Sequence, residues 1–308
     1  MRVRFSLPAR RFMKNKVLVI VGPTASGKSS LAVKLAKKFD GEVISADSRQ
    51  VYKGLNIGTG KITKKEMWGV PHHLIDVASP NKQFSVSDFL ILTNQAIAKI
   101  VNKRKLPIVV GGTGFYINAL AGAVAFPDVP PNKKLRERLN KKSALELFKI
   151  LKEKDPKRAK IIDPNNKVRL IRALEIVEKI GHVPQLGSWT SKYHFVFVGM
   201  RAKNLNEKIY RRLVKRLGPM IREGKKLHAQ GLTYKRMHEL GLEYRYMAKF
   251  LKGQMTKNQT TNELFKEIKK YAKRQMTWFK RNKKIKWFKP DEFETIIQYA
   301  NKNLGRDE

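Results

Sequence analysis

Apolar residues in this chain follow two patterns, short continuous runs and longer stretches with helical spacing. Five short runs predict strands, at 16–21, 42–49, 72–77, 106–114 and 194–200. Apolar positions three or four residues apart predict helices at 29–36, 85–104, 133–140, 143–152, 156–161 and 166–180, and the chain after 206 is expected to be mainly helical. This alternation is typical of an α/β fold, here a parallel sheet wrapped by helices.

The segment before the last predicted strand has no strand pattern. It follows the Pro-rich linker 126–131, and its last helix is expected to stop at Gly181. We therefore predict a basic N-terminal tail at 1–15, an α/β core made of 16–127 and 194–308, and an all-helical insertion at 128–193. The tail is rich in Arg and free of acidic residues, so a transit peptide is an alternative, and Met13 is an alternative start.

The turn after the first predicted strand carries the most specific motif. The run Gly22-Pro23-Thr24-Ala25-Ser26-Gly27-Lys28-Ser29 matches the phosphate loop G-x-x-x-x-G-K-[ST], and a helix is predicted to follow. Glycine allows the backbone to approach an anion, N–H groups at the helix start point at it, and Lys28 adds a charge. The expected phosphate contacts are Gly22, Thr24, Ala25, Ser26, Gly27, Lys28 and Ser29. The Ser29 hydroxyl is expected to hold Mg²⁺.

Two further strands end in residues suited to chemistry. Ligands in open α/β sheets bind at the carboxyl ends of the strands. Asp47, at the end of the second strand, is therefore a candidate catalytic carboxylate, with a turn or helix cap as the alternative. The fourth strand breaks into Gly111-Gly112-Thr113-Gly114, where Thr113 can offer a hydroxyl to a ligand, although a purely structural turn is also possible.

Composition points to a large anionic partner. The 66 Lys and Arg against 25 Asp and Glu give a formal net charge of +41, which suggests a polyanion larger than a nucleotide, with general lysine enrichment as the alternative. The absence of cysteine excludes disulfides, cysteine-ligated zinc and thiol catalysis, and fits a cytoplasmic protein. No apolar run approaches the length of a membrane span, so no membrane partner is expected.

Common phosphate-loop NTPases are disfavoured. Many carry an Asp at the end of an apolar strand to hold Mg²⁺, whereas the most apolar strand here ends in glycines. No Asn-Lys-x-Asp segment, which would read guanine, is present. His72 and His73 are adjacent on a predicted strand and point to opposite faces, so they cannot chelate one metal together. What remains is a small kinase-like transferase scaffold.

At this point the motifs taken together resemble those of the tRNA dimethylallyltransferase family, in its bacterial form. The segments that carry the resemblance are Gly22–Ser29, Ile44–Tyr52, Asn56–Lys61, Pro71–Asp76, Pro107–Gly114 and Tyr271–Gln275. They are collinear over about 17–288, and the run Asp-Ser-Arg-Gln-Val-Tyr is the most diagnostic. The resemblance implies that the phosphate loop holds the diphosphate of dimethylallyl diphosphate rather than ATP.

The resemblance also implies roles for individual residues. Asp47 is the expected general base for the adenosine N6 amine, and Thr113 contacts the reacting adenosine. Arg212 and Arg216, four positions apart on one helix face, could reach the diphosphate or the tRNA, with a solvated basic helix as the alternative. The expected contacts to the tRNA anticodon stem-loop are Asp47, Ser48, Arg49, Gln50, Thr113, Arg136, Val168, Arg169, Arg172, Lys273, Arg274 and Gln275. The protein is expected to act as a monomer.

One departure and two alternatives accompany this interpretation. Most relatives have Gly-Tyr-Lys or Gly-Tyr-Arg where this chain has Glu243-Tyr244-Arg245, which puts the local backbone in question. An ATP-dependent small-molecule kinase shares the scaffold but does not explain the charge or the helical insertion. A non-enzymatic RNA-binding protein is disfavoured because Lys28, Ser29, Asp47 and Thr113 are all present.

Overall fold

The structure, a computed structural model, describes residues 16–122, 127, 129–184 and 191–305. The predicted tail at 1–15 and part of the predicted linker therefore lie outside the described residues. The chain divides into two compact units. One consists of Met1–Ala121 together with Ser191–Glu308, and the other of Gly122–Thr190.

Six parallel strands form the sheet of the first unit, in the order β3-β2-β4-β1-β5-β6. Their bounds are β1 Lys16–Val21, β2 Gly41–Ser45, β3 His72–His73, β4 Leu106–Gly111, β5 His194–Met200 and β6 Lys286–Phe288. The parallel sheet expected from the alternating pattern is confirmed. Because all strands are parallel, their carboxyl ends lie at one edge, where the loops after β1, β2 and β4 begin.

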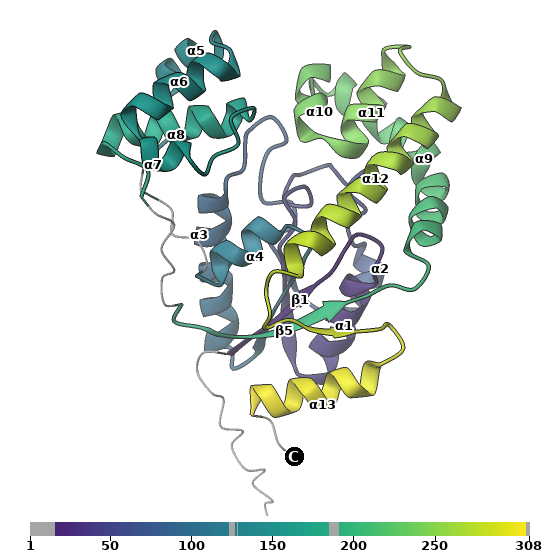
Figure 1. Cartoon of the computed structure of the whole chain (residues 1–308). Helices are drawn as coiled ribbons and strands as arrows, with labels where there is room; N and C mark the ends of the chain where they lie inside the picture. The colour runs from purple at the N-terminus through teal and green to yellow at the C-terminus, as the bar shows by residue number, and fades with distance from the viewer. Residues whose placement is uncertain (1–15, 123–126, 128, 185–190, 306–308) are drawn as a thin grey trace, which may run out of the picture. The chain divides into compact units, whose positions relative to one another are not determined.

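Helices of the first unit cover both faces of the sheet (Figure 1). Leu18 and Ile20 of β1 pack on one side with α1 and α13, while Val17 and Val19 face α3 and α4 on the other. The bounds are α1 Lys28–Lys38, α2 Lys64–Met67, α3 Val86–Asn102, α4 Gly114–Leu120, α9 Leu205–Ala229, α10 Tyr234–Leu240, α11 Leu242–Leu251, α12 Lys257–Phe279 and α13 Phe293–Leu304. None of the described helices combines the length and apolar character needed to cross a bilayer.

A separate apolar core joins α9, α10, α11 and α12 to the segment that follows β2. Val51, Tyr52 and Leu55 of that segment are buried among apolar residues of these helices. The helical residues include Leu213, Leu217, Met220, Met237, Tyr244, Met247 and Leu264. This packing fixes α9 beside the loop that connects β2 to α2.

The second unit is helical in its described part. Its helices are α5 Lys133–Asn140, α6 Ala144–Lys154, α7 Pro156–Ala159 and α8 Lys167–Ile180. Their facing apolar side chains form one core, built from Leu135, Leu139, Leu147, Leu151, Leu170 and Leu174. Helix α8 ends at Gly181, whose φ of 82° is a left-handed conformation that glycine adopts without strain, as predicted.

Three predicted strands end earlier than the sequence pattern indicated, and one of them, predicted over 106–114, ends at Gly111. The prediction of a strand over 72–77 is wrong beyond His73, because Leu74 (φ 61°) and Asp76 (φ 55°) adopt left-handed conformations that a strand cannot contain. The second strand ends at Ser45 rather than 49. Asp47 consequently lies in the loop beyond the strand. The short elements α2 and β6 were not predicted, since four and three residues carry too little periodicity.

Candidate functional site

The predicted phosphate loop connects β1 to α1, and its glycines are required by geometry. Gly22 has a φ of 155°, and a Cβ there would lie 2.8 Å from the carbonyl oxygen of Met200. Gly27 caps α1 with a φ of 87°. The N-terminus of α1 therefore opens onto the loop, in the arrangement that binds anions through backbone N–H groups.

Lys28 supplies a cation that forms no ion pair with any carboxylate among the described residues. Its Nζ donates to the carbonyl oxygen of Pro23 at 3.1 Å. Withdrawal from water and, to a smaller extent, the nearby positive charge of Arg212 outweigh the opposing effect of Asp47 and together lower the pKa of Lys28 to about 8. A bound anion would relieve this penalty, so the environment of Lys28 is suited to a phosphate or diphosphate.

A cavity of about 110 Å³ lies in front of the loop. Its lining includes ten predicted site residues, Thr24, Ala25, Lys28, Ser29, Asp47, Arg49, Gln50, Arg212, Arg216 and Gln275. Gly22, Ser26 and Gly27 belong to the loop but do not line the cavity. The buried Oγ of Ser26 has no hydrogen-bond partner in the described part of the chain.

Asp47 organises a turn at the end of β2. Its Oδ1 accepts the backbone N–H groups of Arg49 at 2.8 Å and Gln50 at 3.3 Å. Its Oδ2 makes no hydrogen bond to the described residues, and Asp47 lines the cavity. The neighbouring Ser48 N–H donates to Thr113 Oγ1 at 3.1 Å. The turn alternative for Asp47 is therefore correct for one oxygen, while the other stays available to a ligand.

Arg212 and Arg216 both line the cavity from α9. Arg216 donates through Nη1 to the carbonyl oxygen of Ile57 at 3.0 Å and through Nε to that of Arg212 at 3.2 Å. Together with Lys28 and Arg49 they place four cationic side chains around one cavity. A concave site with this charge favours a polyanionic ligand.

Gln275 ties α12 to two loops of the site. Its Oε1 accepts the Thr24 N–H at 2.8 Å, and its Nε2 donates to the carbonyl oxygen of Gly112 at 2.9 Å. The neighbouring Lys273 and Arg274 are exposed and do not line the cavity. The role in tRNA binding stays a prediction for all three residues.

Four predicted tRNA contacts lie in the helical unit. Arg136 makes a two-pronged ion pair with the buried Glu175, at 2.6 Å through Nε and 2.7 Å through Nη2. Arg172 contacts the same carboxylate at 3.2 Å. Val168 and Arg169 are exposed, and Arg169 has no side-chain hydrogen bond to the described residues. Arg136 and Arg172 thus have a structural role, whereas Arg169 is free to contact a ligand.

Several further residues that line the cavity were not predicted as site residues, among them Thr59, Gly60, His72, Glu243 and Tyr271. Four of them lie inside quoted motifs, so motif membership was the available signal. For Glu243 the signal was its departure from the family pattern. Burial raises the pKa of the Glu243 carboxyl, and the nearby Arg216 opposes that rise.

The questioned backbone before Glu243 has a left-handed conformation. Gly241 has a φ of 76° and Leu242 a φ of 34°, and α11 begins at Leu242. Glu243 itself lies within α11 and is not among the described residues with a positive φ, so its backbone conformation does not require a glycine.

The oxygen groups that line the cavity suit Mg²⁺, but the described residues do not form a metal site made of protein ligands alone. Among the described residues, no cluster of three or more His, Asp and Glu could hold a metal ion. The Ser29 hydroxyl and the Asp47 carboxylate both line the cavity. Mg²⁺ prefers oxygen ligands and is usually held by one or two protein oxygens together with substrate phosphates.

Comparison with known proteins gives a consistent result. The family model described as IPP transferase matches residues 50–282. The tRNA dimethylallyltransferase of Caldanaerobacter subterraneus subsp. tengcongensis is 39% identical over 298 residues, covering 92% of this chain and 94% of that protein.

Solved structures of similar proteins point to the same family as the sequence comparisons. The tRNA isopentenylpyrophosphate transferase of Bacillus halodurans has a TM-score of 0.72 and 37% identity, covering 95% of this chain and 97% of that one. A eukaryotic dimethylallyltransferase acting on tRNA has a TM-score of 0.79 and 26% identity, covering 95% of this chain and 77% of that one. With a family model that spans more than half of its sequence and a relative 39% identical over nearly all of it, this chain belongs to the IPP transferase family.

Proposed function

We propose that the protein transfers a dimethylallyl group from dimethylallyl diphosphate to the N6 amine of the adenosine on the 3′ side of the anticodon in tRNA. In this reaction the bond between C1 of the donor and its bridging oxygen breaks, and the oxygen leaves with the electron pair as diphosphate. A bond forms between N6 and C1, and N6 loses a proton. The observation that carries the proposal is a cavity lined by four cationic side chains, Lys28, Arg49, Arg212 and Arg216, and by the Asp47 carboxylate, whose Oδ2 accepts no hydrogen bond from the described residues.

The diphosphate half of the cavity is built by the phosphate loop and α9. Backbone N–H groups at the start of α1 and the side chains of Lys28, Arg212 and Arg216 would neutralise the charge that develops as the diphosphate departs. Mg²⁺ held by the Ser29 hydroxyl and the diphosphate would neutralise further charge on the leaving group.

The proton half is assigned to Asp47. Two backbone N–H groups hold its Oδ1 and Asp47 lines the cavity, so Oδ2 would be the acceptor for the N6 proton. The Thr113 hydroxyl, which already accepts from Ser48, can still donate its own proton to the adenosine.

Recognition of the anticodon stem-loop is assigned to several basic and polar groups. Sequence-specific RNA binding usually takes unpaired loop bases out of their stack. The proposed contacts are Ser48, Arg49, Gln50, Lys273, Arg274 and Gln275 in the first unit, with Arg136, Val168, Arg169 and Arg172 in the helical unit. The net charge of +41 supports a nucleic-acid partner of this size. We further propose that the protein works as a monomer in the cytoplasm.

A transfer assay tests this function against the kinase alternative. The protein is incubated with radiolabelled dimethylallyl diphosphate, or with ATP labelled on its γ-phosphate, with and without bulk tRNA. Label is expected in tRNA only from the prenyl donor. Phosphoryl transfer to a small metabolite, without prenyl transfer, would move the assignment to a kinase.

A further inference from the structure

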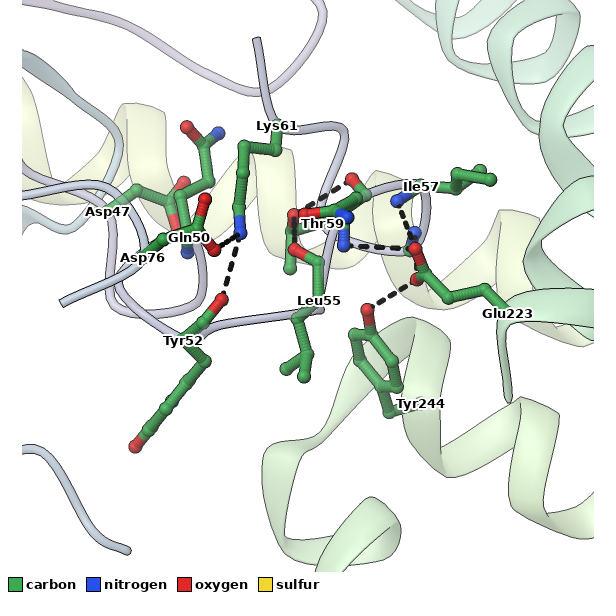
Figure 2. A network of polar contacts seen from close by, with 12 residues as sticks. Asp47, Gln50, Tyr52, Leu55, Ile57, Thr59, Lys61, Asp76, Glu223 and Tyr244 are labelled. Atoms are coloured by element: carbon green, nitrogen blue, oxygen red, sulfur yellow. Dashed lines mark hydrogen bonds and ion pairs between the residues drawn. The ribbon is translucent and has the colours of Figure 1, made fainter. Parts of the chain in front are cut away.

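The side chain of Glu223 on α9 binds backbone N–H groups of the loop between β2 and α2. Its carboxylate accepts the N–H groups of Asn56 at 3.0 Å, Ile57 at 2.7 Å and Gly58 at 3.0 Å. It also accepts the hydroxyl of Tyr244 at 2.7 Å (Figure 2). Burial and the carboxylate raise the pKa of Tyr244, so the hydroxyl remains a donor. Glu223 therefore collects four donors, three of them from consecutive backbone positions.

The same helix holds this loop a second time through Arg216. Arg216 donates to the carbonyl oxygen of Ile57, the residue whose N–H is held by Glu223. Positions 216 and 223 are two helical turns apart, so both side chains project from one face of α9. Ile57 is thus fixed at its N–H and at its carbonyl oxygen by two charged groups of one helix.

Two glycines of this loop lie so close to side chains of α9 and α11 that a Cβ on either would force a shift. A Cβ at Gly60 would lie 2.5 Å from Arg216 Nη1, and a Cβ at Gly58 would lie 2.7 Å from the Tyr244 ring. Thr59 and Gly60 line the cavity beside Arg212 and Arg216. A shift of the loop would therefore move the surface against which the Arg216 guanidinium rests.

The far end of the loop is anchored independently. Lys61, whose side chain is only 5% exposed, pairs with Asp76 at 2.5 Å and donates to the carbonyl oxygen of Tyr52 at 2.8 Å. Figure 2 shows this second anchor on the side of the loop away from Glu223. Loss of Glu223 would accordingly leave α9 holding Ile57 only through the contact of its carbonyl oxygen with Arg216, while the other end of the loop stays in place.

We propose that Glu223 is a positioning residue for transfer, which fixes residues 56–60 and thereby orients the Arg216 guanidinium toward the donor diphosphate. This inference rests on the proposed function. Glu223 does not line the cavity, so it acts through the loop and Arg216 rather than by touching substrate.

The test measures steady-state kinetics of Glu223→Gln. The amide keeps the side-chain shape but turns an N–H₂ group toward backbone donors, so the donor KM is expected to rise about tenfold, with a smaller change in kcat and in the KM for tRNA. Glu207→Gln, on an exposed residue of the same helix, is the matched control and is expected to behave as wild type.

A double-mutant cycle separates positioning from general stability. If Glu223 acts through Arg216, Glu223→Gln should add little to the donor KM in an Arg216→Ala background. Additive effects, or losses in all kinetic parameters that follow the melting temperature, would overturn the inference.

Calorimetric measurement of inorganic pyrophosphate binding distinguishes failure of the proposed function from failure of the positioning role of Glu223. If the wild-type protein does not prenylate tRNA but Glu223→Gln weakens its binding of pyrophosphate, the proposed function is refuted and the positioning role of Glu223 is retained. Wild-type prenylation with unchanged behaviour of Glu223→Gln would refute the positioning role alone.

Discussion

The side-chain oxygen of Gln275 accepts the backbone N–H of Thr24 at 2.8 Å, which joins α12 to the phosphate loop across 251 positions of the chain. Through its Nε2, Gln275 also holds Gly112 after β4. One buried amide therefore sets the spacing between the loop expected to hold the diphosphate and the loop expected to face the adenosine.

Gln275→Met is expected to loosen this connection. It leaves the Thr24 N–H and the Gly112 carbonyl unpaired, which should cost about 2 kcal/mol of stability and raise the donor KM roughly tenfold. Thermal melting and donor titration check this expectation. Gln298→Met, on an exposed glutamine of α13, provides the control. Equal behaviour of the two variants would contradict the proposed link.

Donor affinity is expected to fall above pH 8. Burial lowers the pKa of Lys28 to about 8, so the free protein loses this cation as the pH rises through that value. The protonated form of Lys28 binds the diphosphate. The affinity for the donor should therefore reach its full value below pH 8 and decline about tenfold per pH unit above it. Binding of dimethylallyl diphosphate measured from pH 6.5 to about 9.5 checks the sign.

Lys28→Met should bind the donor weakly and without this inflection. Lys38→Met, an exposed lysine near the end of α1, should retain the wild-type profile. An unchanged inflection in Lys28→Met would assign the titration to another group.

Gly60→Ala tests the contact between the loop and Arg216. Gly60 has a φ of 60°, and a Cβ there would lie 2.5 Å from Arg216 Nη1, so the guanidinium would have to shift. Gly69→Ala is a matched control, because Gly69 has a φ of 78° and nothing within 4 Å. Both variants should lose about 1 kcal/mol through backbone strain. Only Gly60→Ala should raise the donor KM, and a similar rise in Gly69→Ala would show that strain alone is responsible.

Substitutions of Arg169 and Arg136 in the helical unit are expected to differ in their effect on stability. Arg169→Ala should weaken tRNA use, lower the salt dependence of tRNA binding by about one unit of slope, and leave stability and donor binding unchanged. Arg136→Ala leaves the buried Glu175 with fewer partners and should also destabilise the protein by about 2 kcal/mol.

Arg138→Ala, an exposed neighbour of Arg136 on α5, serves as the control for both measurements. Unchanged tRNA use in Arg169→Ala would remove Arg169 from the proposed contacts.

The elements that depend on local sequence were predictable. The phosphate loop, the stop of α8 at Gly181 and the parallel sheet follow from motif, glycine and apolar spacing. The end of β3 did not follow, because Leu74 and Asp76 adopt left-handed conformations without a glycine to signal them.

Tertiary links were also beyond the sequence pattern. Glu223 and the N–H of Ile57 are 166 positions apart, and nothing in the spacing around Glu223 distinguishes it from the other charged residues of a long basic helix. Likewise, Arg136 carries no local signal that its guanidinium pairs with Glu175 on α8. Such roles depend on which surfaces the apolar cores bring together.

The central claim is prenyl transfer to tRNA with Asp47 as the base, and a single-turnover assay tests it most directly. Labelled dimethylallyl diphosphate and tRNA are mixed with excess wild-type protein or Asp47→Asn, and label in the tRNA is followed over time. The variant should transfer about 10²–10⁴ times more slowly while binding both substrates nearly as well. No label in tRNA with the wild-type protein, or an unchanged rate in Asp47→Asn, would contradict the account.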